Sequence, residues 1–457
     1  ESAMNAQRER ARAASRFQMG EVTSVNVADT TFLGYTSIEG AGEVISIVHD
    51  QAEADVLETG ARGIVVLDQT PFYAESGGQV GDRCELRMGD ALFEVTDARY
   101  VSGRVVAHIG QVVSGSISIG DRVSAQVESD ARAGTANNHS ATYLLHAALR
   151  EVLGDHVQQR GSLVDPDRLR FDFGHQQALS EEELDRVEDL VNRQVRANHK
   201  VVTEVMSINK ARARGAVALF GEKYDDTVRV LSMGALEQES HFSIELCGGT
   251  HVAATGDIGL FKITSESGVA AGVRRIEAVT GQAALKFVSD LQAAQRQVAQ
   301  TLKTDPSRLQ ERSVQVMAEL KEKDSTIAAA NQKLALFRAS ELVEESETIG
   351  GVKVVAQFVE GISSANLKPL VEQVKEKLGQ GIVLLVIADG EKVQLGAGVT
   401  SDFVSKVKAG DLVKTAAVAV GGKGGGRPDF AMAGGTDKSR VHEAVSVAKD
   451  WLNEKLA

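Results

Sequence analysis

Cysteine and long apolar runs are both scarce in this sequence. Its 457 residues contain only two cysteines, Cys84 and Cys247. One disulfide is conceivable, but a reducing cytoplasm and a metal-bound thiolate fit this cysteine usage better. No run of eighteen apolar residues is present, so we expect no membrane span. No signal-peptide pattern opens the chain, and we therefore expect a cytoplasmic location.

Basic residues are outnumbered by acidic ones, 50 to 63, which gives a formal net charge of −13. This balance argues against indiscriminate nucleic-acid binding, although it leaves room for a local basic surface. The 43% hydrophobic and 25% charged residues are typical of a soluble globular protein. The chain is too long for one ordinary core, and its length predicts about three domains. Because residue 1 is Glu1, we expect a piece of a longer polypeptide.

The order of local patterns predicts a multidomain α+β protein. Short β-branched runs separated by Gly and Asp indicate a small β-barrel, and later segments mix helices with strands. The predicted parts are the end of a preceding helical region (1–20), a β-barrel (21–130), an α+β domain (131–281), a helical hairpin or coiled-coil arm (282–347) and a C-terminal α/β domain (348–457).

Capping and breaking residues suggest where individual helices begin and end. A helix over 136–153 would start at Asn137 or Asn138, since asparagine is a good N-cap. Ser180 and the acidic residues after it predict a second helix, to about Asn198. Two C-terminal helices are predicted at about 402–408 and 439–455.

The arm contains no glycine and is rich in Gln, Ala, Glu and Lys. Leu320, Ile327 and Leu334 recur every seven residues, which is coiled-coil spacing, and Asp305-Pro306 should break the region into two helices. Such a region is more typical of a spacer or a dimer arm than of a catalytic element.

The segment Cys247-Gly-Gly-Thr-His251 carries the strongest chemical signal. It offers a thiol and an imidazole, and His139 offers a second imidazole about a hundred residues upstream. Three protein ligands with a fourth position open are typical of catalytic zinc. Tyr143 follows His139 at i+4, where a further ligand would lie, whereas His146 is two turns from His139 and should not share the metal. The alternative is a helix-capping histidine beside a buried cysteine.

Three further segments could bind a ligand. Ser76-Gly77-Gly78-Gln79 forms either a tight turn or a loop whose backbone approaches a ligand. Of the adjacent Arg274 and Arg275, one could pair with a carboxylate while the other is free for phosphate. The glycine-rich stretch 421–429 is not a P-loop; beside Lys423 and Arg427 it forms either a phosphate nest or a flexible loop.

Together these segments resemble alanyl-tRNA synthetases. Pro71–Gln79, the His139 helix, Cys247–His251, Arg274–Glu277 and Lys423–Pro428 occur in that family in the same order. The resemblance covers nearly the whole chain and implies the C-terminal half of such an enzyme: barrel, editing domain, arm and C-terminal tRNA-binding domain. ATP would be needed only by the aminoacylation domain, which is absent here.

The resemblance also implies residue roles. The family pattern His-x-x-x-His with Cys-x-x-x-His assigns Zn²⁺ to His139, Cys247 and His251, with Tyr143 at the fourth-ligand position. It implies hydrolysis of mischarged Ser-tRNA(Ala) or Gly-tRNA(Ala), since a pocket for alanine cannot strongly reject either amino acid. We expect these further residues to take part: Gln159, Gln79 and Thr250 in catalysis, and Ser76, Gly77, Gly78, Arg274, Lys423 and Arg427 in substrate binding.

Other functions remain open from the sequence. Replacement of the fourth ligand by Tyr143 leaves the possibility of a tRNA-binding and dimerising module with a degenerate editing site. A free-standing editing factor is a third possibility. The resemblance implies tRNA(Ala) as partner and a homodimer formed through the arm and the C-terminal domain.

Overall fold

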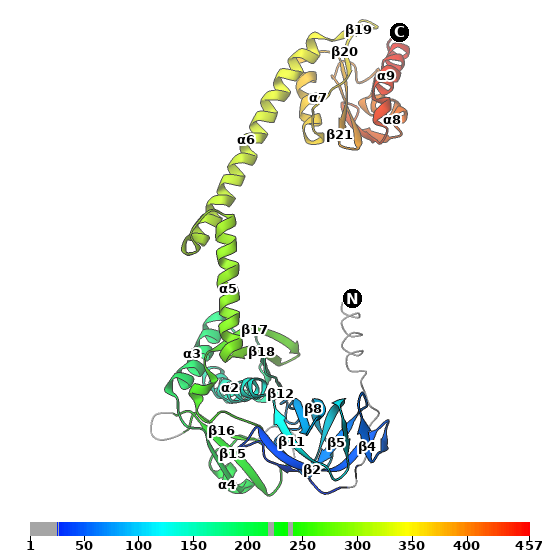
Figure 1. Ribbon diagram of the computed structural model, residues 1–457. Helices are drawn as coiled ribbons and strands as arrows, with labels where there is room; N and C mark the ends of the chain where they lie inside the picture. The colour runs from blue at the N-terminus through cyan, green and yellow to red at the C-terminus, as the bar shows by residue number, and fades with distance from the viewer. Residues whose placement is uncertain (1–24, 26, 218–223, 236–240) are drawn as a thin grey trace. The chain divides into compact units, whose positions relative to one another are not determined.

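The computed structural model describes residues 25, 27–217, 224–235 and 241–457, so the helical region predicted over 1–20 lies outside the described residues. The chain divides into two compact units, Glu1–Gln295 and Arg296–Ala457. Figure 1 shows a β-rich region followed by a mixed region in the first unit, and helices around a sheet in the second. No helix among the described residues combines the length and apolarity needed to cross a lipid bilayer.

The predicted small β-barrel is confirmed. Its sheet closes because β11 pairs with both β7 and β2, so that Val127 lies opposite Cys84 while Val123 lies opposite Gly42. Strand β11 alternates exposed and buried residues, as expected for a strand with one face on the core. The barrel strands are β2 (Glu39–His49), β5 (Arg62–Leu67), β7 (Cys84–Met88), β8 (Ala91–Ser102), β9 (Val105–Ser114) and β11 (Arg122–Val127), with β3 (Ala52–Glu53) at the edge. Short pairs β1–β6 (Thr31–Phe32, Gln69–Thr70) and β4–β10 (Val56–Glu58, Ser116–Ser118) flank it.

Helix α2 (Ser129–Leu153) begins almost directly after the barrel. The predicted start at Asn137 or Asn138 is therefore wrong, and the N-cap is Glu128. The first turns were missed because they pack through polar groups: buried Arg132 donates to Gly34 O, to Pro71 O and to the carboxylate of Asp82. Asn138 does not cap the helix; its side-chain amide donates to Asp165 O at 2.8 Å.

The rest of the first unit is the predicted α+β region. Apolar residues of α2 and α3 (Glu181–Ala197) pack with Phe171 and Phe173 of β13 in one core. The predicted start of α3 is confirmed, because Ser180 and Glu183 form a capping box. One sheet has the order β12 (Gln159–Val164), β13 (Leu169–Gly174), β18 (Val273–Thr280), β17 (Phe261–Ala270). The other contains β14 (Val202–Ser207), β15 (Thr227–Met233) and β16 (Ser243–Leu246); short helices are α4 (Ile208–Ala213) and η1 (Thr255–Ile258).

The region predicted as an arm is helical, with α5 (Gly281–Thr301), η2 (Pro306–Arg308) and α6 (Leu309–Glu344). The break falls at Asp305-Pro306 as predicted, since the Asp305 side chain accepts from Ser307 N in front of η2. Leu320, Ile327 and Leu334 of α6 are each about half exposed, at 52%, 58% and 49%. Their pairing with another chain stays a prediction.

The second unit ends in a six-stranded sheet of order β19-β20-β21-β22-β24-β23. Residues of α7 pack in one core cluster, and those of α8 and α9 in another. Its elements are β19 (Glu347–Ile349), β20 (Val352–Phe358), α7 (Ser364–Leu378), β21 (Ile382–Asp389), β22 (Lys392–Val399), α8 (Ala409–Ala419), β23 (Lys423–Gly426), β24 (Phe430–Gly435), η3 (Lys438–Arg440) and α9 (Val441–Leu456).

Two predictions for this unit are wrong. Residues 401–406 form turns, and the helix lies later, at α8. Phe403 and Val404 pack on the core from those turns. The glycine-rich stretch does not form a nest: its residues Lys423–Gly426 are the edge strand β23, paired with β24, and only the flanking residues lie outside strands. Within 421–426 only Gly421 has a positive φ, so the alternating backbone of a nest is not formed.

Candidate metal centre

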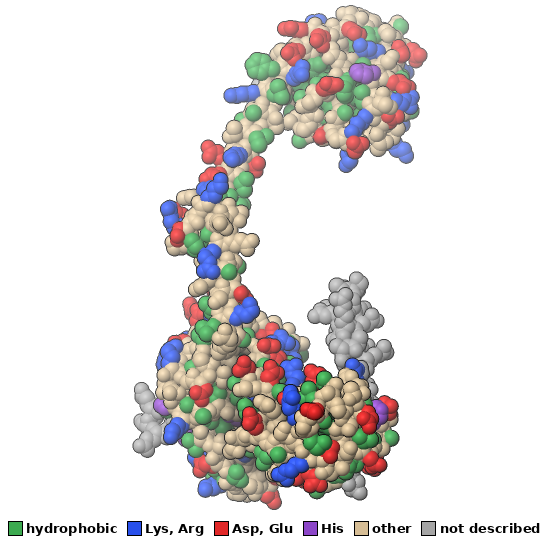
Figure 2. Space-filling view, viewed as in Figure 1, with side chains coloured by type: hydrophobic (Ala, Val, Ile, Leu, Met, Phe, Trp, Pro, Cys, Tyr) green, Lys and Arg blue, Asp and Glu red, His purple; other side chains and the backbone are tan. Residues whose placement is uncertain are grey.

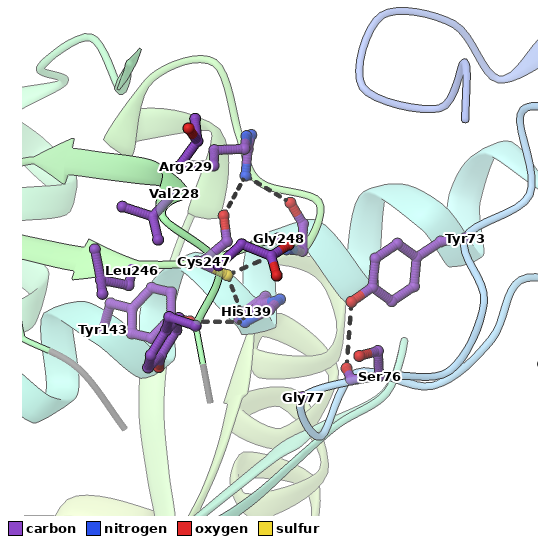
Figure 3. A pocket seen from close by; sticks show the side chains of 14 residues that line it. Tyr73, Ser76, Gly77, His139, Tyr143, Val228, Arg229, Leu246, Cys247 and Gly248 are labelled. Carbon is purple, nitrogen blue, oxygen red and sulfur yellow. Dashed lines mark hydrogen bonds between the residues drawn. The ribbon is translucent and has the colours of Figure 1, made fainter. Parts of the chain in front are cut away.

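The structure brings the three predicted ligands together. The Cys247 thiol lies 3.1 Å from His251 Nε2 and 3.6 Å from His139 Nε2. The potential ligand atoms of all three residues lie within 4.8 Å of one another. Cys247 and His139 are buried (Figure 3). Among the described residues, this is the one group of three or more such side chains that could hold a metal ion.

Glycine at position 249 allows the close approach of the two segments that carry the ligands. His139 lies on α2, and Cys247–His251 follows β16. A Cβ on Gly249 would lie only 2.3 Å from His139 Cε1 and 2.6 Å from Nδ1. At position 248 the nearest atom to such a Cβ is Tyr35 Oη, at 3.9 Å. Position 249 therefore needs glycine for close packing, whereas position 248 has room for a side chain.

The tautomer of His139 follows from Gln79, which is fully buried. Thr250 N donates to Gln79 Oε1 at 3.0 Å, which identifies that atom as the amide oxygen. The same oxygen lies 2.8 Å from His139 Nδ1, so Nδ1 must carry a proton and donate to it. The lone pair of His139 is consequently on Nε2, the nitrogen that faces Cys247.

His251 is oriented in the same way by Ser140. The Ser140 hydroxyl donates to Ala136 O at 2.8 Å and therefore has no proton left for the imidazole. His251 Nδ1, 3.1 Å from that hydroxyl, must then be the donor, which leaves the lone pair on Nε2 beside the thiol. Hydrogen bonds of this kind, from the far nitrogen of an imidazole, orient metal-ligating histidines.

Burial sets the protonation of the cluster. Burial, with a smaller contribution from Arg229, lowers the pKa of His139 to about 3. Burial also lowers the pKa of His251, with His139 and Arg229 as smaller causes. Burial raises the pKa of the Cys247 thiol, and hydrogen bonds from Tyr143 and Gly249 partly offset this rise. Both imidazoles are thus neutral, as metal ligation requires, while a thiolate needs a nearby cation.

Tyr143 extends toward this cluster from the next turn of α2. Its hydroxyl lies 3.3 Å from His139 Nε2, and its side chain is only 5% exposed. Burial raises the pKa of Tyr143 well above its usual value. Two neutral imidazoles and one thiolate are a donor set that suits Zn²⁺, and the Tyr143 hydroxyl lies beside it. His146 takes no part and instead pairs with Glu245, 3.0 Å away.

A cavity of about 390 Å³ opens beside the cluster. Tyr73, Ser76 and Gly77 line it from the barrel, and Val228 and Arg229 line it from β15 (Figure 3). The Ser76–Gln79 segment is a tight turn with two backbone hydrogen bonds, and Gly77 and Gly78 have φ of 60° and 85°. This turn places Gln79 in the cluster and Gly77 on the cavity wall. Gly78 packs on Ser162 instead, 2.5 Å from where its Cβ would be.

Other predicted site residues lie apart from this cavity. Gln159 donates to Ser162 Oγ at 3.1 Å and is absent from the cavity lining; its buried Oε1 has no partner.

The expectation of one free arginine in the 274–275 pair is wrong. Arg274 forms a bidentate pair with Glu266 and Arg275 one with Asp172, because both carboxylates lie on neighbouring strands.

Lys423 and Arg427 belong to the second unit. Lys423 is exposed on the edge strand β23. The Arg427 guanidinium is also exposed and pairs with Asp429 at 3.2 Å. Their predicted role in substrate binding stays a prediction.

Two residues important to the site were not predicted. Arg229 donates to Cys247 O at 2.9 Å and to Gly249 O at 3.0 Å, and so holds the loop that carries two ligands. Ser140 bonds to Val252 N as well as to His251. Ser140 could have been noticed, since it follows His139 directly, but the position of Arg229 on β15 carries no local signal.

Three family models match separate parts of this chain. Residues 1–131 match the model for tRNA synthetases class II (A), and residues 228–277 match the threonyl and alanyl tRNA synthetase second additional domain. Residues 351–454 match the DHHA1 domain. The C-Ala domain of Aquifex aeolicus alanyl-tRNA synthetase, a solved structure, matches 24% of this chain and 98% of its own at 25% identity. The TM-score of that match is 0.23.

Curated relatives match the entire chain. The alanine–tRNA ligase of Shewanella loihica is 49% identical over 458 residues, which is 100% of this chain and 52% of the relative. That of Halorhodospira halophila is 47% identical over 456 residues, again 100% and 52%. The chain thus spans about half the length of the curated relatives it matches. From the additional-domain and DHHA1 matches and from these relatives, the chain belongs to the alanyl-tRNA synthetase family.

Proposed function

We propose that this chain hydrolyses tRNA(Ala) that carries the wrong amino acid, serine or glycine, and so proofreads the product of the longer synthetase. The longer protein would join alanine to tRNA(Ala) with ATP, in the cytoplasm. The observation that carries the proposal is the convergence of Cys247, His251 and His139 beside a cavity of about 390 Å³. The reaction is hydrolysis of an ester: water adds to the carbonyl carbon, the bond to the ribose oxygen breaks, and that oxygen takes a proton.

His139, Cys247 and His251 would hold Zn²⁺, with Tyr143 beside it. When bound, zinc supplies a Lewis acid for an ester oxygen or for water. The chain itself positions the groups: Gln79 and Ser140 hold the two imidazoles with Nε2 toward the thiol. Arg229 holds the Cys-Gly-Gly loop, and Thr250 holds Gln79.

The cavity wall would bind the aminoacyl end of the substrate. The Ser76–Gly77 turn brings backbone polar groups close to any ligand in the cavity. A catalytic role for Gln159 would require its side chain to move, since in this structure that side chain faces Ser162 and not the cavity. We therefore assign ester positioning to the Ser76–Gln79 turn and to the loop held by Arg229.

Deacylation of Ser-tRNA(Ala), measured together with zinc content, tests the proposal. We expect hydrolysis by the unsubstituted chain and about one zinc per chain, and loss of both in Cys247→Ala. Cys84→Ala is the matched control, because Cys84 is in the barrel strand β7 and outside the cluster. Hydrolysis that persists in Cys247→Ala would reject the site.

The presence of Tyr143 at the fourth-ligand position favours one alternative, a tRNA-binding and dimerising module in which the editing site has decayed. That module would bind no zinc and leave Ser-tRNA(Ala) intact. Dimerisation would proceed through the arm and the C-terminal domain, and the half-exposed Leu320, Ile327 and Leu334 of α6 are compatible with it.

A further inference from the structure

This 457-residue chain contains only five tyrosines, and most of them lie at the candidate cavity. Three of them line it: Tyr73, Tyr143 and Tyr224. The other two, Tyr35 and Tyr100, are not part of that lining and are 50% and 43% exposed. The proposed deacylase uses only the inner tyrosines. The two outer ones expose large aromatic surfaces to solvent, which calls for an explanation.

The ring of Tyr35 is held rigidly although half of it is exposed. Its hydroxyl donates to Gly248 O at 2.7 Å, in the loop between the two proposed ligands Cys247 and His251. The guanidinium of Arg229 lies 4.3 Å from the ring centroid on one face. Phe32 packs edge-on, with ring centroids 4.8 Å apart. An aromatic ring fixed on one face and at its edges, beside a cavity, loses little entropy when a planar group stacks on it.

Tyr100 is attached to the same cavity wall through the barrel. It follows Arg99 on β8, and Arg99 forms a β-bridge with Glu75, the residue before the Ser76–Gly77 turn. The Tyr100 phenol is close enough to raise the pKa of both Tyr35 and Tyr73, though burial is the larger cause for each. The two exposed rings therefore belong to one mouth of the cavity.

The charges around this mouth are mixed. Arg104 forms an ion pair with Asp225 at 2.8 Å, but both side chains are more than 70% exposed. Such a pair contributes at most about 1 kcal/mol, so the Arg104 guanidinium is available to a phosphate. Glu75 and Asp97 pair with Arg99 nearby. On the face shown in Figure 2, acidic and basic side chains are interspersed, so charge alone does not mark a nucleic-acid surface.

We propose that Tyr35 and Tyr100 form a stacking platform for the unpaired bases at the 3′ end of an RNA strand, with Arg104 beside a phosphate. This inference rests on the proposed function, because the platform would guide the terminal ribose ester into the cavity. Aromatic side chains bind single-stranded bases by stacking, with little dependence on sequence. With only one or two phosphates contacted, binding should depend weakly on salt, with a slope of about −0.7 per phosphate.

The test is equilibrium binding of an uncharged single-stranded RNA ending in CCA, followed by the anisotropy of a 5′ dye. Tyr35→Ala and Tyr100→Ala should each weaken binding by about 5- to 150-fold, the loss of one stacked base. Tyr100→Phe keeps the ring and should bind like the unsubstituted chain, whereas Tyr35→Phe keeps the ring but loses the bond to Gly248 O and should retain most of the binding. Val205→Ala, at a residue of β14 that is 70% exposed, is the control for a surface truncation.

Two readouts separate this inference from the deacylase proposal. Loss of RNA binding in Tyr100→Ala with zinc content unchanged supports the platform, because no hydrogen bond joins Tyr100 to the Cys-Gly-Gly loop among the described residues. Deacylation by a chain whose RNA binding is the same in both alanine variants overturns the platform alone. Tyrosine-dependent RNA binding without any deacylation supports the platform and rejects the deacylase. If the phenylalanine variants lose as much binding as the alanine variants, stacking is rejected.

Discussion

Substitution by alanine should disrupt zinc binding at Gly249 and leave it unchanged at the adjacent Gly248. In Gly249→Ala the added methyl carbon would lie 2.3 Å from His139 Cε1 and 2.8 Å from Gln79 Oε1. Carbon atoms in ordinary contact are about 3.5–4.0 Å apart, so the imidazole must retreat by roughly 1 Å. In Gly248→Ala the nearest atom is 3.9 Å away, and nothing has to move.

A displacement of this size should abolish tight zinc binding, because ligand distances in zinc sites are defined to within about 0.2 Å. Loss of a single orienting hydrogen bond already costs about 10- to 100-fold in affinity, so Gly249→Ala should bind zinc at least about 100-fold more weakly. The overpacking should also lower the free energy of unfolding by about 1–3 kcal/mol. Gly248→Ala should match the unsubstituted chain in both respects.

Competition of each variant with a chromogenic chelator for Zn²⁺ measures the affinity, and circular dichroism checks the fold. Equal zinc affinity in folded Gly249→Ala and Gly248→Ala would refute the geometry described for this loop. Absence of zinc binding by the unsubstituted chain would refute the metal centre itself.

Three other outcomes follow from buried groups in the first unit. Asp82→Asn should lower the free energy of unfolding by about 3–5 kcal/mol, since it leaves the Arg132 charge buried without its partner. The double variant Asp82→Asn with Arg132→Met should recover part of this loss. Equal melting temperatures for the single and double variants would contradict the reasoning. Gln79→Ala should reduce zinc affinity about 10- to 100-fold in a chelator titration, whereas Gln111→Ala, at a half-buried barrel glutamine outside the cluster, should not. Burial lowers the pKa of His108 to about 4, whereas its pKa in the unfolded chain is 6.5. Between these two pKa values only the unfolded state binds the extra proton, so the stability of the folded state falls as the pH falls. Urea unfolding at pH 7 and pH 5 should show this loss, by up to about 1.4 kcal/mol per pH unit, and His108→Gln should reduce it; an unchanged slope would argue against a neutral buried imidazole.

The architecture was largely readable from the sequence because it rests on local signals. Short β-branched runs separated by Gly and Asp predicted the barrel, Ser180 predicted the start of α3, and Asp305-Pro306 predicted the break before α6. The start of α2 failed because its first turns are held by a charged network around Arg132 instead of an apolar stripe. Patterns of hydrophobicity cannot show such a network.

For the site, residue type predicted which side chains would meet but not how they are held. The chemistry of Cys247, His251 and His139 was sufficient to bring them together as a hypothesis, which the geometry supports. The contributions of Arg229 and Tyr35 depend on tertiary contacts with the Cys-Gly-Gly loop. Arg274 and Arg275 misled for the same reason, since their carboxylate partners are on other strands.

The barrel residue Gln79 bonds directly to His139 on α2, and a few residues away Asp82 pairs with Arg132 of the same helix. The barrel is thus a structural component of the centre rather than a separate module beside it. Anyone who recombines parts of related synthetases should therefore exchange the barrel and the following α+β region as one block. A crossover placed between them would have to preserve both pairings to keep the imidazole in place.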